Sequence, residues 1–336
     1  MRRQRVRAGS QVAVATLALA AALLSPAGAA ASPRLGSVGP CGLLPYDSTA
    51  PPVYQHVVVI MDENLSYQNF LASTQAPYLQ GLAAACGSEA DMHAATHPSQ
   101  GNYMAATSGV VSGSAVQTAA DNVFHQLQVA GRSWRNYAES MPSSCAHQTL
   151  TVPLYKNGHT PAFWYTDLVT PRNTCAKFDV PLSPALDTAI TTDRLPTYSW
   201  ITPNVCDDMH WAATCTYPST SRVAVGDTWL STLVPRLTAM PSYQAGRTLV
   251  VVTFDEGDGD NPATSTGVDC ADPTYYPLHP DCQIPTVVVS PYVVPGAVDT
   301  SDNNLYTLLA TTEDIFGLPR LGRAVGSLGM RAGLAF

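Results

Sequence analysis

The sequence predicts an α/β fold with a mostly parallel central sheet, flanking helices and long loops stapled by disulfides. Three short apolar runs are continuous and rich in β-branched residues, which is typical of strands buried on both faces. These runs are Val57–Met61, Thr248–Phe254 and Thr286–Val289. Helical segments lie between them, so we expect the sheet to be sandwiched between helices.

The helical segments differ in sequence from the middle of the chain. Helices are expected at Ala76–Ala85, Asn102–Ser108, Gly226–Leu237 and Tyr306–Phe316. The stretch Ser140–Asp208 is rich in Pro, Thr and aromatic residues and is weakly periodic. We interpret it as long loops that cover the sheet.

The first 31 residues have the pattern of a signal peptide. Arginines crowd the first seven positions, an apolar run covers Val12–Leu24, and small residues fill Ala27–Ala31. The run is too short to span a bilayer, which disfavours the alternative of an uncleaved anchor. We therefore expect residues 1–31 to be removed on secretion to the extracellular side. Residues 32–52 are interpreted as an N-terminal extension and residues 53–336 as a single domain.

The charge balance limits the partners of the mature protein. Four of the 17 Lys+Arg and none of the 25 Asp+Glu lie in the leader, which leaves a formal net charge of −12. Such an acidic chain has no basic stripe for nucleic acid and no polybasic patch for anionic lipid. No later segment is long and apolar enough to cross a membrane, so we expect a soluble monomer. An anionic substrate would need positive charge from a bound metal or a few local groups.

All eight cysteines follow the leader, and an even number in an exported chain predicts disulfides. Zinc binding is the alternative, but no C-x-x-C pair occurs. Connectivity does not follow from spacing. We predict pairing in sequence order, with Cys206–Cys215 and Cys270–Cys282 as short loop staples.

Acidic pairs follow two of the predicted strands. Asp62-Glu63 comes directly after the first apolar run, and Asp255-Glu256 after the second. Ligands of open α/β sheets bind beyond the carboxyl ends of the strands, so these carboxylates are expected to meet around one point. Carboxylates that close repel each other, and a hard cation relieves the repulsion. Solvated loop acids that cap the following helices are the alternative.

The segment Thr96–Gly109 delivers a serine, Ser99, to the start of a short helix. Helix N-termini bind phosphoryl groups, and contact with a metal would activate a serine hydroxyl there. A capping role is common for serine at this position, and the segment by itself favours it.

Together, the motifs resemble the bacterial phosphoesterase family. This family contains secreted acid phosphatases and bacterial phospholipases C and belongs to the alkaline phosphatase superfamily. The resemblance covers about Gln55–Ala324 and is closest to the phosphatase branch, which includes phosphatidylinositol-3-phosphatase-like enzymes. The segments that carry it are Val57–Tyr67, His97–Gly109, Tyr137–Pro142, Lys156–Pro161, Cys206–His210, Gly226–Leu230, Phe254–Glu256, Ile284–Gly296 and Glu313–Pro319.

The resemblance implies a metal-dependent phosphatase with an alkaline phosphatase-like fold. Its substrate would be a phosphate monoester, with phosphoinositides and other phospholipid headgroups among the candidates. Ser99 would be the nucleophile and form a phosphoserine, and Asn102 would hold a phosphoryl oxygen. His159 and His210 would bind phosphate or protonate the leaving group, although by itself either would more often be structural. One divalent cation would be held by Glu63, Asn64, Asp255 and Glu256.

The chain departs from the family pattern at two places. Gly101 replaces a usual proline, and Asn304-Leu305 replaces a usual Asp-His pair. If that histidine binds a second metal or phosphate in relatives, this protein has one metal, a shifted substrate range or lower activity. The alternatives are a phospholipase C-type phosphodiesterase and an exported binding protein on a catalytically weak scaffold.

Overall fold

The computed structural model describes residues 39–113, 115–147, 153–170, 174–210, 212–215, 221–258 and 267–336. The predicted signal peptide lies outside these residues. The part of the predicted extension that is described packs against the domain, since Cys41 is bonded to Cys86 and Tyr243 donates to the carbonyl of Pro40. Within the described residues, no helix has both the length and the apolar character needed to span a bilayer.

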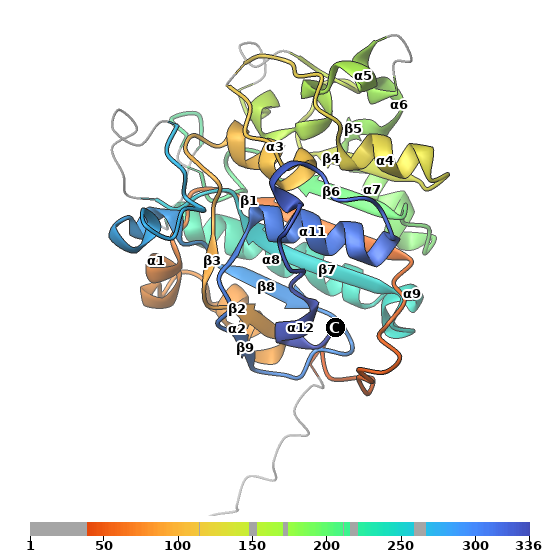
Figure 1. Ribbon diagram of the computed structural model, residues 1–336, viewed down its shortest axis with the longest axis vertical. Helices are drawn as coiled ribbons and strands as arrows, with labels where there is room; N and C mark the ends of the chain where they lie inside the picture. The colour runs from red at the N-terminus through yellow and green to blue at the C-terminus, as the bar shows by residue number, and fades with distance from the viewer. Residues whose placement is uncertain are drawn as a thin grey trace, which may run out of the picture. The chain divides into compact units, whose positions relative to one another are not determined.

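In the described part of the chain, the core is an eight-stranded sheet in which five neighbouring strands run parallel (Figure 1). In spatial order, the strands are β5 (Asp179–Pro181), β4 (Trp134–Ala138), β6 (Tyr198–Thr202), β1 (His56–Asp62), β7 (Thr248–Phe254), β8 (Thr286–Val289), β2 (Gly87–Glu89) and β9 (Ala297–Asp299). A separate pair is formed by β3 (Met92–His93) and β10 (Asn303–Asn304). The mostly parallel α/β fold predicted from sequence is thus confirmed.

Helices cover both faces of the sheet. They are α1 (Tyr67–Ala72), α2 (Pro77–Ala85), α3 (Gln100–Ser108), α4 (Val123–Val129), α5 (Thr166–Val169), α6 (Cys175–Phe178), α7 (Leu182–Thr191), α8 (Arg222–Thr238), α9 (Pro241–Gln244), α11 (Leu305–Phe316) and α12 (Arg331–Leu334). Helices α3 and α11 pack together in front of the sheet in Figure 1, whereas α2 and α8 pack together behind it. Every residue of α3 is buried, so this helix has no solvent-facing side.

The apolar runs form strands because they can bury both faces. All seven residues of β7 and all four of β8 are buried, as expected for continuous β-branched sequence. β8, however, runs antiparallel to β7. The four predicted helices correspond to α2, α3, α8 and α11, and α11 begins with a capping box between Asn304 and Thr307.

The interpretation of residues 140–208 as loops was wrong for part of this segment. It contains α7, β5 and also β6, which lies between β4 and β1 in the sheet. The sequence of β6 is Tyr-Ser-Trp-Ile-Thr, which lacks a run of aliphatic residues, yet every residue is buried. Its strand identity comes from hydrogen bonding on both sides rather than from its own pattern.

The predicted disulfides are confirmed, all in sequence order. The bonded pairs are Cys41–Cys86, Cys145–Cys175, Cys206–Cys215 and Cys270–Cys282.

Candidate active site

The candidate site lies where three adjacent parallel strands end. Asp62 is the last residue of β1 and Glu63 follows it, while Asp255 and Glu256 follow β7. The backbone N–H of Asp255 donates to the carbonyl of Asp62 at 3.1 Å, and that of Glu63 donates to the carbonyl of Asp208, beyond β6, at 2.7 Å. The two acidic strand ends therefore lie side by side, as expected from sequence, and Asp208 joins them.

These carboxyl groups are crowded and buried. Burial, followed by the charges of Asp255 and Asp208, raises the pKa of Glu63 well above its usual value. Burial and the charge of Glu256 do the same to the pKa of Asp255. Burial and the charge of Asp208 raise the pKa of Asp62. Without a compensating positive charge, these groups would be forced to hold protons.

The donor set fits a divalent cation. Both carboxylate oxygens of Asp62 and Oδ2 of Asp208 have no hydrogen-bond partner in the described part of the chain. Ligand atoms of Glu63, His159 and Asp208 lie within 4.8 Å of one another. Buried oxygens without partners are costly, and oxygen-rich clusters are what hard cations bind.

Ser99 lies at the centre of the acidic cluster. Its hydroxyl donates to Oε2 of Glu63 at 3.1 Å and to Oε1 of Glu256 at 3.2 Å. Although Ser99 occupies the N-cap position of α3, its side chain makes no capping hydrogen bond. The capping role that the segment by itself favoured is therefore wrong, and the hydroxyl faces the carboxylates.

The two predicted asparagines are placed differently. Asn64 adjoins the cluster, since its backbone N–H donates to Oδ1 of Asp255 at 3.2 Å and its amide nitrogen to Oε1 of Glu256 at 3.1 Å. Asn102 is fully buried beneath the loop before Ser99. Its oxygen accepts from the N–H groups of Ala95 and Thr96, and its nitrogen donates to the carbonyl of Thr96. These contacts hold the loop in shape.

Both predicted histidines lie at the site. Nδ1 of His159 is 3.2 Å from Oε1 of Glu63 and 3.4 Å from Oδ2 of Asp208. Burial, with Lys156 nearby, lowers the pKa of His159 to about 3, so the ring is neutral. The ring centroids of His210 and His159 are 5.9 Å apart. The backbone N–H of His210 donates to Oδ1 of Asp208 at 2.7 Å. His210 is partly exposed and His159 is buried.

His97 is a residue of this site that the sequence analysis did not single out. Its Nδ1 lies 2.7 Å from Oε2 of Glu256, and its Nε2 lies 2.7 Å from Oδ2 of Asp281. Burial disfavours the charged ring, but the two carboxylates outweigh burial and raise the pKa of His97 to about 10. The charged ring thus holds Glu256 in place. The only sequence signal was the position of His97 two residues before Ser99.

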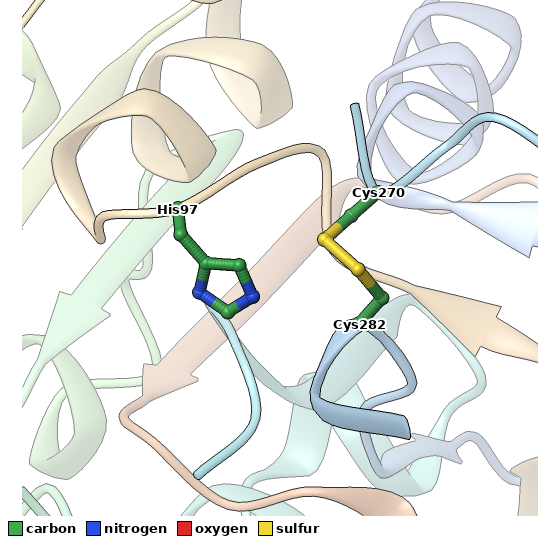
Figure 2. A group of neighbouring side chains, drawn as sticks. All are labelled: His97, Cys270 and Cys282. Atoms are coloured by element: carbon green, nitrogen blue, oxygen red, sulfur yellow. A yellow bond between two sulfur atoms is a disulfide. The ribbon is translucent and has the colours of Figure 1, made fainter. Parts of the chain in front are cut away.

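Figure 2 shows His97 beside the Cys270–Cys282 disulfide. The two sulfurs are bonded to each other, so this group is no metal centre, although its atoms lie close together. The disulfide instead fixes the segment next to Asp281. The N–H of Cys270 also donates to the carbonyl of Ala95, which ties the disulfide to the loop before Ser99.

The two departures from the family pattern have structural explanations. A Cβ on Gly101 would lie 2.5 Å from Cγ2 of Thr96, so a larger residue does not fit this packing. Asn304 is the N-cap of α11, and Leu305 is fully buried in the hydrophobic core.

Comparison with known proteins shows the family of the chain. The Phosphoesterase family pattern matches residues 69–319. A phosphatidylinositol-3-phosphatase from Mycobacterium tuberculosis is 29% identical over 300 residues, covering 87% of this chain and 86% of that protein. An acid phosphatase from Aspergillus fumigatus is 25% identical over 276 residues, covering 78% of this chain and 54% of its own length.

The fold is similar to that of a protein of the alkaline phosphatase superfamily from Vibrio parahaemolyticus, with a TM-score of 0.54 and 13% sequence identity. The similarity covers 89% of this chain and 76% of that one. The chain belongs to the Phosphoesterase family and is a hydrolase of phosphoric esters with an alkaline phosphatase-type fold.

Proposed function

We propose that this protein is an exported, metal-dependent acid phosphatase that hydrolyses phosphate monoesters, phosphoinositides among them, through a phosphoserine at Ser99. The observation that carries the proposal is the Ser99 hydroxyl between Glu63 and Glu256, at the start of a helix and inside a buried carboxylate cluster. A serine used only as a cap would face its own helix instead.

One divalent cation would be held by Glu63, Asn64, Asp255 and Glu256. Bound there, it would neutralise the carboxylates and polarise the phosphoryl oxygens of the substrate. Both carboxylate oxygens of Asp62 and Oδ2 of Asp208, which have no hydrogen-bond partner among the described residues, support a cation in this part of the site.

The two contacts of the Ser99 hydroxyl support a proton transfer from it during the attack. Oγ of Ser99 forms a bond to phosphorus while the ester P–O bond breaks, and the proton moves to one of the two carboxylates that accept from it. Water then attacks the phosphoserine, which releases phosphate and restores the hydroxyl. The N–H groups of Gly101 and Asn102 at the start of α3 already donate to the carbonyls of Pro98 and Ser99, so this helix end would support an anionic phosphoryl group mainly through its partial positive charge.

We assign different roles to the two histidines, binding of a phosphoryl oxygen to His159 and protonation of the leaving group to His210. His159 is neutral, so it serves as a hydrogen-bonding group for a phosphoryl oxygen. His210 is the more exposed of the two and lies beside Asp208, which makes it the proton donor to the departing alcohol. Asn102 supports both steps by holding the loop that carries Ser99.

The substrate class and the location rest on other observations. Relatives named for phosphatidylinositol-3-phosphatase and acid phosphatase activity support monoesters as substrates. The leader pattern and the four disulfides support export, because disulfides persist in oxidising compartments.

The test compares Ser99→Ala with Thr96→Ala on an aryl phosphate and on the matching aryl diester. Thr96 is a matched control, because its hydroxyl donates to the carbonyl of His97 and not to the cluster. We expect Ser99→Ala to lower kcat by about 10³-fold or more with little change in Tm. We expect Thr96→Ala to stay active, and chelator to abolish wild-type turnover reversibly.

Full activity of a folded Ser99→Ala protein would overturn the mechanism. Preference for the diester would point to a phospholipase C-type activity instead.

A further inference from the structure

One guanidinium group connects three loops of the candidate site. Arg222 is the first residue of α8, and its Nη1 donates to the carbonyl of Asn64 at 2.7 Å. The same nitrogen donates to the carbonyl of Met209. Nη2 donates to Oδ2 of Asp258 at 2.7 Å. Since these partners follow β1, β6 and β7, a single side chain bridges the ends of three adjacent strands.

Two of the three acceptors belong to residues in the left-handed region. Asn64 has a φ of 48° and Met209 a φ of 71°. Residues other than glycine rarely adopt this conformation, and it persists only where the surroundings enforce it. Hydrogen bonds from one Arg222 nitrogen to both carbonyls provide such enforcement.

The third partner is itself anchored. Oδ1 of Asp258 accepts from the backbone and the hydroxyl of Ser66 and from the amide of Asn69. The Arg222–Asp258 pair is largely buried, with side chains 20% and 23% exposed. By contrast, Arg236, on the same helix, pairs with Asp187 where both side chains are 40% exposed. Exposed pairs contribute little, whereas the Arg222 pair lies within the loop network.

We propose that Arg222 is a positioning residue for phosphoryl transfer. It holds Asn64, a proposed metal ligand, and Met209, which precedes the proposed proton donor His210, at a fixed separation. Arg222 makes no contact with the reacting atoms in this mechanism. Arginine suits this role because its planar fork donates several hydrogen bonds in fixed directions, which an ammonium group on a flexible stem does not do. The inference rests on the proposed function of the site.

The experiment measures Arg222→Gln and Arg222→Lys, with Arg236→Gln as the matched control on α8. For each folded protein we would determine kcat and KM on an aryl phosphate, the divalent-metal concentration at half-maximal activity, and amide hydrogen exchange of residues 62–66 and 206–210. Wild type with and without chelator, together with Ser99→Ala, would be measured in parallel.

We expect Arg222→Gln to lower kcat by about 100-fold, because small misplacements of reacting groups have effects of that size. The metal midpoint should rise by about tenfold or more, as for other residues that support ligands. Exchange should accelerate in both segments. Arg222→Lys should recover thermal stability but not kcat, and Arg236→Gln should match wild type.

A folded Arg222→Gln protein with wild-type kcat, metal midpoint and exchange would overturn the inference, and so would full recovery of kcat by Arg222→Lys. If Arg222→Gln does not fold, Arg222→Lys tests the inference by itself. A lower kcat and faster exchange than in wild type would support the inference, and wild-type values of both would overturn it. An inactive or chelator-insensitive wild type, or an active Ser99→Ala, would instead contradict the proposed function.

Discussion

Tyr103 gives a quantitative test of the carboxylate cluster. It lies on α3, one turn after Ser99, and its hydroxyl donates to Oε1 of Glu63 at 2.7 Å in a fully buried contact. Its ring also stacks on His159, with ring centroids 5.5 Å apart. Substitution Tyr103→Phe keeps the ring and its packing but removes the hydrogen bond that orients a proposed metal ligand.

The magnitude follows from the kind of hydrogen bond that is lost. A hydrogen bond to a charged group contributes about 1.5–3 kcal/mol. If this free energy is lost from the metal-bound state, metal affinity falls by about 10–100-fold, which agrees with the usual effect of removing a partner of a ligand. A similar fall in kcat/KM is expected at subsaturating metal.

The assay is calorimetric titration of divalent metal into chelator-treated protein. Tyr165→Phe is the control, because Tyr165 is as buried as Tyr103 and its hydroxyl forms a hydrogen bond with that of Thr107. Thr107 lies on α3, as Tyr103 does, but away from the carboxylate cluster. The Tyr165→Phe protein should lose stability without losing metal affinity. Equal metal affinity in Tyr103→Phe and wild type would refute the assignment of Glu63 as a ligand oriented by Tyr103.

Two further predictions concern packing and pH. Gly101→Ala places a methyl group 2.5 Å from Cγ2 of Thr96, so it should lower the free energy of unfolding, measured by urea denaturation, by about 1–3 kcal/mol. Gly81→Ala is the control: its Cβ would meet open space, so it should raise the free energy of unfolding by about 0.5–1 kcal/mol. Equal effects of the two substitutions would contradict the packing argument. Burial, followed by the charge of Asp299, raises the pKa of Glu89 from 4.5 to about 8. The folded state therefore favours the protonated acid, and the contribution of Glu89 to the free energy of unfolding should fall by up to about 5 kcal/mol between pH 4.5 and 8, because only the unfolded chain ionises this group freely there. The fall in Glu89→Gln should be smaller than that in wild type by this contribution, and the same pH dependence in both proteins would show that Glu89 makes no such contribution.

Local sequence patterns predicted much of the framework. The runs that became β1 and β7 are continuous and β-branched, so their burial and strand identity follow from composition alone. Because the residues that follow such strands lie at the sheet edge, Glu63 and Asp255 were correctly expected on adjacent strand ends. The even number of cysteines after the predicted leader indicated full disulfide pairing, and the predicted sequence-order connectivity is confirmed.

Other features were not visible in the sequence. The strand β6 has a mixed polar and aromatic sequence, so it was interpreted as loop, although it borders β1 and leads to Asp208. Ser99 looks like a helix cap in its own segment, and only the approach of Glu63 and Glu256 shows that its hydroxyl faces elsewhere.

By itself, then, the sequence determined the buried strands and the acidic strand ends, because each depends on the burial of neighbouring residues, and the even number of cysteines predicted that all of them would pair. Tertiary structure decided which groups meet. The pairing of His97 with Asp281, 184 positions later, and the hydrogen bonds of Arg222 to Asn64 and Met209 join segments far apart in the chain. Hydrophobic periodicity specifies that a segment is buried, but not which other segment lies against it. That choice depends on the packing of the whole domain around one core.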